Sequence, residues 1–199
     1  MVPRTRSATG HIDMESTISR DGSGTMSGHL DAPRFGDRRG AELIMREAGI
    51  SPAALHKRCA CEQDFYLAAY ELAMGAVLER AQAAAAGEGD WVAQIRASLR
   101  ALLDGLAGSP ELARACALVE LSAAEGAEQA SRAEVLARLA SLLSTGEGIA
   151  AGTVEETNCR LLADGVLDTI GTTVRAASPT ALPSLLVQLH WWAVALRRT

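Results

Sequence analysis

The uneven distribution of alanine and leucine along this chain constrains its fold more than any other feature. The 199 residues include 38 Ala and 25 Leu, and only three of these 63 lie in residues 1–40. Helices favour Ala and Leu, whereas strands favour β-branched and aromatic residues, and aromatic residues make up only 4% of the chain. The count predicts an all-α protein with an atypical first fifth. It argues against a β-sandwich, a β-barrel and a parallel-sheet enzyme.

Residues that start and stop helices punctuate the rest of the chain. Ser-Pro pairs begin at Ser51, Ser109 and Ser178. A serine there can accept a free backbone N–H, and a proline at the next position sacrifices no helical hydrogen bond. Further caps are expected at Asp90, at Ser131 with Glu134 and at Thr153 with Glu156, and glycine stops at Gly49, Gly87, Gly108, Gly126 and Gly146.

Apolar residues between these marks recur at steps of three and four, which is the period of a helix face. The last such series runs from Leu182 to Leu196 and forms a seam that is able to meet a partner helix. The spacing predicts helices at 40–48, 52–58, 62–86, 90–107, 110–122, 131–145, 153–176 and 180–197. Residues 1–39 are poor in apolar side chains and broken by Gly, Ser and Pro, so we expect this segment to be disordered.

The charge of the chain is also uneven. The net charge is −5 and the isoelectric point is near 5.4, which is not the profile of a nonspecific nucleic-acid binder. The segment from Arg34 to Arg58, however, contains six cationic and three acidic residues, so it has a positive net charge and the remainder of the chain is strongly acidic. An acidic body with one basic segment indicates a local contact with an anion.

Several classes of function are disfavoured by motifs that the sequence lacks. The four cysteines do not form a disulfide framework, and Cys59 and Cys61 have no second pair of the kind that zinc sites use. We find no nucleophile elbow, phosphate-binding glycine loop or metalloprotease motif. No apolar run is long enough to span a bilayer, and no signal peptide is evident. We therefore expect a cytoplasmic protein that is not an enzyme and holds no cofactor or metal.

Residues 40–61 carry the most informative pattern in the chain. A short amphipathic helix with Ile44 and Met45 on its inner face leads into Gly49, and a capped second helix is expected from Ser51. Helix, glycine turn and helix make the helix-turn-helix pattern, whose second helix enters the major groove of DNA. The Ser51 hydroxyl and the helix N-terminus can meet a phosphate, and His56, Lys57 and Arg58 add hydrogen-bond donors.

This stretch resembles the tetracycline-repressor (TetR) family of bacterial regulators. Ile44, Ala48, Gly49, Ile50, Ser51 and Leu55 fit the family's typical run, and Glu62–Glu71 continues it. The resemblance implies a helix-turn-helix region at 40–71 and a helical effector-binding and dimerisation domain at 72–199. It further implies a homodimer that binds a palindromic double-stranded DNA operator, usually as a repressor, and responds to a small-molecule effector.

The resemblance and the pattern together select three sets of site residues. Those expected to contact DNA are Arg39, Ser51, Pro52, Ala53, His56, Lys57 and Arg58. Those expected to line an effector pocket, with ordinary core packing as the alternative, are Tyr66, Tyr70, Met74 and Trp91. Those expected at the dimer interface are Val166, Ile170, Leu182, Leu185, Leu189, Trp192 and Leu196.

A second reading of the same sequence stays open. The family places a helix ahead of residue 40, and the segment from His11 to Gly36 has no apolar stripe that could form it. The alternative is therefore a helical dimer that has lost DNA binding and serves as a ligand-binding or protein-interaction module.

Overall fold

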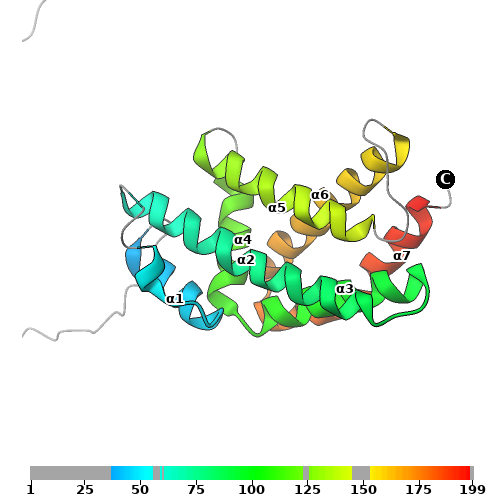
Figure 1. The fold of residues 1–199 in the computed structure, drawn as a ribbon, viewed down its shortest axis with the longest axis horizontal. Helices are drawn as coiled ribbons and strands as arrows, with labels where there is room; N and C mark the ends of the chain where they lie inside the picture. The colour runs from blue at the N-terminus through cyan, green and yellow to red at the C-terminus, as the bar shows by residue number, and fades with distance from the viewer. Residues whose placement is uncertain (1–36, 56–58, 60, 123–125, 145–152, 198–199) are drawn as a thin grey trace, which may run out of the picture. The chain divides into compact units, whose positions relative to one another are not determined.

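A computed structural model describes residues 37–55, 59, 61–122, 126–144 and 153–197, and all regular structure in these ranges is helical (Figure 1). The all-α prediction is thus confirmed for this part of the chain. The elements are α1 (Arg38–Glu47), η1 (Pro52–Ala54), α2 (Glu62–Ala86), α3 (Trp91–Ala107), α4 (Pro110–Ser122), α5 (Ala127–Leu143), α6 (Val154–Ala176), η2 (Pro179–Leu185) and α7 (Leu186–Arg197).

Local capping chemistry sets most of the helix starts. The Ala93 N–H donates to Asp90 Oδ1 at 2.9 Å, and the Glu156 N–H donates to Thr153 Oγ1 at 3.2 Å. Both predicted caps are confirmed, because each side chain accepts one of the N–H groups that a helix start leaves free. The helices predicted at 62–86 and 110–122 have those bounds.

Three predicted helix ends differ from those in the structure. The expected capping box at Ser131 lies inside α5, which begins at Ala127, and the buried Ser131 hydroxyl donates instead to the Glu71 carboxylate of α2. The last predicted helix is split, because Pro183 lies within a 3-10 segment and the α-helix begins only at Leu186. The expected stop at Gly126 precedes α5, with φ at +85°.

The helices share one hydrophobic core that extends from Ala41 in α1 to Ala193 in α7. The long helix α2 packs against α1, α3 and α5, while α4 packs along α6 (Figure 1). The predicted boundary between residues 71 and 72 falls within α2, which is one continuous helix. Of the predicted disordered segment 1–39, residues 1–36 lie outside the described residues, and α1 already begins at Arg38.

Candidate functional site

The segment from α1 to η1 forms a tight turn between two buried anchors. Ile44 and Met45 of α1 are buried on one side, and Leu55 is buried on the other. Between them Gly49 has φ of +72°, and the Ile50 N–H donates to the Met45 carbonyl oxygen at 2.8 Å. This bond closes the helix end by a left-handed residue, which glycine adopts without strain. The predicted helix and glycine turn are present.

The described part of the second element is a 3-10 turn. Of the helix expected at 52–58, Pro52–Ala54 form this turn, with the Leu55 N–H donating to the Pro52 carbonyl oxygen at 3.1 Å. The Ser51 side chain makes no capping hydrogen bond. The predicted DNA contacts His56, Lys57 and Arg58 lie outside the described residues.

The outer face of α1 carries exposed cations beside this turn. Arg39 and Arg46 are both exposed, and their spacing of seven residues places them on one helix face. Arg38 lies over the Phe65 ring at 5.3 Å and pairs with Glu42 at 3.7 Å. Ser51 and Ala53 are exposed and Pro52 is half-buried at the adjoining turn. The exposed Glu42 lies between Arg39 and Arg46 on this face, so the three exposed arginines of α1 outnumber one exposed carboxylate and leave a small, weakly cationic surface.

The four residues predicted to line an effector pocket do not gather at one place. Tyr66, Tyr70 and Met74 are buried core residues of α2, and Trp91 is a half-buried residue at the start of α3. From Tyr66 to the end of α2 the helix rises roughly 30 Å, so Trp91 lies at the far end.

The three α2 side chains pack around a buried thiol on α4. Cys116 Sγ lies 3.4 Å from Met74 Sδ and is hydrogen-bonded to Tyr70. Burial raises the pKa of the Cys116 thiol to about 12 and raises the pKa of Tyr70 well above its usual value. Both groups are therefore neutral at physiological pH, and the thiol is unreactive.

The predicted dimer seam faces the interior of the same chain. Val166, Ile170, Leu182 and Leu189 are all 0% exposed, because η2 and α7 pack against α3 and α6. Leu185, Trp192 and Leu196 are partly buried against the same core. The helical spacing correctly marks the inner face of α7, but the four fully buried side chains have no area left for a partner subunit to cover.

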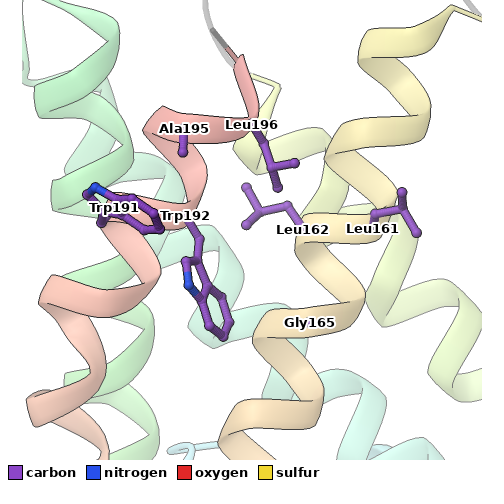
Figure 2. A pocket seen from close by; sticks show the side chains of 7 residues that line it. All are labelled: Leu161, Leu162, Gly165, Trp191, Trp192, Ala195 and Leu196. Carbon is purple, nitrogen blue, oxygen red and sulfur yellow. The ribbon is translucent and has the colours of Figure 1, made fainter. Parts of the chain in front are cut away.

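Side chains of α6 and α7 form an apolar groove at the surface, and two of them, Trp192 and Leu196, belong to the predicted dimer seam (Figure 2). Its volume is about 380 Å³. Leu161 and Trp191 remain 61% and 67% exposed, and the neighbouring Val187 is 78% exposed. Figure 2 shows Trp192 reaching between α6 and α7, with Leu162 and Leu196 pointing toward one another above it. The lining residues are Leu161, Leu162, Gly165, Trp191, Trp192, Ala195 and Leu196.

The residues predicted at the dimer interface include Trp192 and Leu196 of this groove but not its exposed members Leu161 and Trp191. The available signal was Val187 followed four residues later by Trp191, a second apolar line on α7 beside the seam. A helix with two apolar lines has one for its own core and one for another surface.

A partly buried ion network joins α6 to α4 and α5. Arg132 Nε donates to both oxygens of Glu120 at 3.0 Å, and its Nη2 donates to Asp164. Burial raises the pKa of Glu120, and Arg132 opposes this only in part because Asp164 and Asp168 lie nearby. The pKa of Arg132 is nevertheless raised, since it has two carboxylate partners that outweigh its own desolvation. The network holds three helices together through one guanidinium group.

Two further cysteines, Cys59 and Cys61, lie around the start of α2. Cys61 caps α2, with its Sγ accepting from the Asp64 N–H at 3.4 Å, and Cys59 is half-buried against the core.

Within the described ranges, no group of three or more potential ligands is placed to hold a metal ion. None of the helices seen there has the length and apolarity that crossing a membrane requires.

Comparison with protein-family models, with curated proteins and with solved structures found no match to this chain.

Proposed function

We propose that this protein is a homodimeric DNA-binding transcriptional regulator, most simply a repressor, that responds to a small-molecule effector. The observation that carries the proposal is the turn unit of α1, Gly49 and η1, anchored on a helical body and faced with exposed cations. The body contributes a second surface, the apolar groove of α6 and α7. One surface suits the phosphate backbone of DNA and the other suits a second copy of the chain.

The charge of the turn unit supports contact with phosphates. Arg39 and Arg46 are exposed on one face of α1, whereas the chain as a whole is acidic. Exposed guanidinium groups bind phosphate oxygens and release counterions, which fixes the position of a protein on DNA without reading its sequence. Base-specific contacts would come from the turn at Ser51–Ala53 and from the predicted contacts His56, Lys57 and Arg58.

The apolar groove supports pairing of two chains. Leu161 and Trp191 line the groove and remain more than half exposed, as does Val187 one turn before Trp191 on α7, and exposed apolar surface of this kind marks an interaction site. Two helices with apolar faces pair naturally with their own copies as a four-helix bundle around a two-fold axis. Such a dimer would present two turn units, as a palindromic operator requires.

DNA binding is tested by titrating labelled DNA from immediately upstream of the coding sequence, at several salt concentrations. We expect Arg39→Ala and Arg46→Ala each to weaken binding and to lower the salt slope by about one, with the same expectation for Lys57→Ala and Arg58→Ala. Arg100→Ala on the exposed face of α3 removes the same charge elsewhere and is the matched control. Equal effects of all five substitutions would refute the assigned surface.

Dimerisation is tested separately, by sedimentation equilibrium without DNA. We expect Leu161→Glu and Trp191→Glu to convert the dimer into monomers, because a charge in a buried interface is strongly unfavourable. Leu72→Glu is the matched control, since Leu72 is an exposed leucine on α2 that does not line the groove. A protein that is monomeric before substitution would refute the homodimer.

One observation favours the alternative function, a helical dimeric module without DNA binding. Within the described residues, the start of the element that should enter the major groove, Pro52–Ala54, is a 3-10 turn. A short turn offers few base contacts. Dimerisation through the groove, combined with no binding to upstream DNA at micromolar protein and low salt, would select this alternative.

A further inference from the structure

The last residue of α1 makes an unusual contact with a distant helix. The Glu47 carboxylate accepts hydrogen bonds from two backbone N–H groups of α4, at 3.0 Å from Glu111 and 3.4 Å from Leu112. These residues are 64 and 65 positions away along the chain. The contact therefore joins two elements that the sequence does not connect directly.

The backbone chemistry of α4 explains why a carboxylate binds there. Pro110 is its first residue and has no N–H, so Glu111 and Leu112 offer the next free N–H groups of the helix. We predicted a cap from Ser109 within the same segment, but the structure assigns both N–H groups to Glu47. A negative charge at a helix N-terminus is favourable, and charge-assisted hydrogen bonds are about twice as strong as neutral ones.

The contact of Glu47 with α4 is partly buried. Burial raises the pKa of Glu47, while the two backbone hydrogen bonds pull it down. Glu111 adds repulsion and Arg114 adds attraction. The carboxylate thus loses water and is compensated mainly by the two α4 amides, so its position depends on where α4 begins.

The other contacts of α4 connect it to the groove helix. Arg175 Nη1 of α6 donates to the Ala117 carbonyl oxygen of α4 at 3.2 Å. A Cβ on Gly171 of α6 would lie 3.6 Å from the Ala117 Cα, so the two backbones approach closely. The same α6 carries Leu161 and Gly165 of the apolar groove. Contacts therefore lead from the groove through α6 and α4 to Glu47 and α1.

We propose that Glu47 is the positioning residue that couples α1, and with it the cationic turn unit, to α4 and the groove helix α6. The role of this coupling in regulating DNA binding rests on the proposed function. A shift of α4 along its axis carries the Glu47 carboxylate with it and reorients α1, whereas loss of the carboxylate uncouples the two helices.

The coupling is measured by amide hydrogen exchange of the full chain without DNA. We expect Glu47→Ala to speed exchange about tenfold in the first turn of α4 and in α1, which corresponds to about 1.4 kcal/mol, and to leave the centre of α6 unchanged. Glu47→Gln keeps a neutral acceptor and should retain most of the protection. Glu42→Ala is the matched control, because Glu42 lies on the same helix in a surface pair with Arg38.

A double-mutant cycle tests transmission rather than local capping. Arg175→Ala removes the hydrogen bond from α6 to the Ala117 carbonyl oxygen of α4, and we expect it to speed exchange in α1 in the natural background but not in the Glu47→Ala background. The proposal is overturned, and Glu47 is only a cap of α4, if Arg175→Ala speeds exchange in α1 equally in both backgrounds. The same conclusion follows if Glu47→Ala changes the exchange rate in α4 but not in α1.

DNA titrations of the same variants separate this proposal from the proposed function. Coupling through Glu47, with no DNA binding by the natural protein, would overturn the function and leave the coupling intact. DNA binding by the natural protein that Glu47→Ala and Glu47→Gln leave unchanged would overturn the regulatory role of Glu47.

Discussion

Truncation of Leu189 tests whether the seam of α7 belongs to the core of one chain or to a dimer interface. The side chain is 0% exposed, and α7 packs there against α3 and α6. Leu189→Ala deletes buried carbon atoms and leaves a cavity that packed helices fill only in part. Such changes lower the free energy of unfolding by about 2–5 kcal/mol. We expect about 3 kcal/mol for Leu189→Ala, because the Leu189 side chain is fully buried and the higher helix propensity of alanine offsets the loss only slightly.

The assay is urea unfolding followed by tryptophan fluorescence at several protein concentrations. We expect Leu189→Ala to lower the free energy of unfolding by the same amount at every concentration, without a matching change in the monomer–dimer equilibrium. Val187→Ala is the matched control, because Val187 is 78% exposed and its truncation should cost the single chain less than about 0.5 kcal/mol. The reasoning is refuted if Leu189→Ala dissociates the dimer while the unfolding of the monomer is unaffected.

Three further predictions concern the turn, the ion network and the cap of α2. Gly49→Ala should lower the free energy of unfolding, measured thermally or in urea, by about 1–2 kcal/mol, because alanine adopts a φ of +72° only with strain. A Cβ at Gly49 meets no atom within 4 Å, so a clash adds nothing to this cost. Gly89→Ala, where a Cβ also meets no atom within 4 Å and φ is not in that range, should be nearly neutral. Glu120 has a raised pKa in the folded state, so the folded state binds more protons and the stability should fall as the pH rises from about 4.5 through that pKa. Glu120→Gln should flatten this slope in urea midpoints measured across the range, and an unchanged slope would exclude Glu120 as its source. Cys61→Ala should cost about 0.5–1 kcal/mol and Cys61→Ser nearly nothing, since serine can cap α2 as well, and equal losses in both variants would contradict the capping role.

The candidate site was predictable wherever it depended on neighbours in sequence. Gly49 marked a helix end because a left-handed residue is needed there, and the structure places it in that conformation. Ser131 shows the limit of this reasoning. Its spacing to Glu134 matches a capping box, yet its hydroxyl donates a hydrogen bond to the Glu71 carboxylate on another helix. No local sequence pattern reveals a partner 60 residues away.

The two surfaces of α6 and α7 show the same limit at a larger scale. Periodicity identified an apolar line from Leu182 to Leu196 but could not say what it faces. Burying that line on α3 and α6 left Trp191 and Leu161 to form the exposed groove. Which of two apolar lines becomes core depends on how several helices pack together.

The sequence by itself determined that this chain is helical, where most helices begin, and that a helix, a glycine turn and a Ser-Pro turn follow one another near a cluster of cations. These properties follow from propensity, capping and charge within a few residues. Only the tertiary structure decided that Glu47 caps α4, that Tyr70 and Cys116 meet in the core, and that the outer line of α7 stays exposed. Those contacts join residues far apart in sequence, so they exist only once the helices have packed.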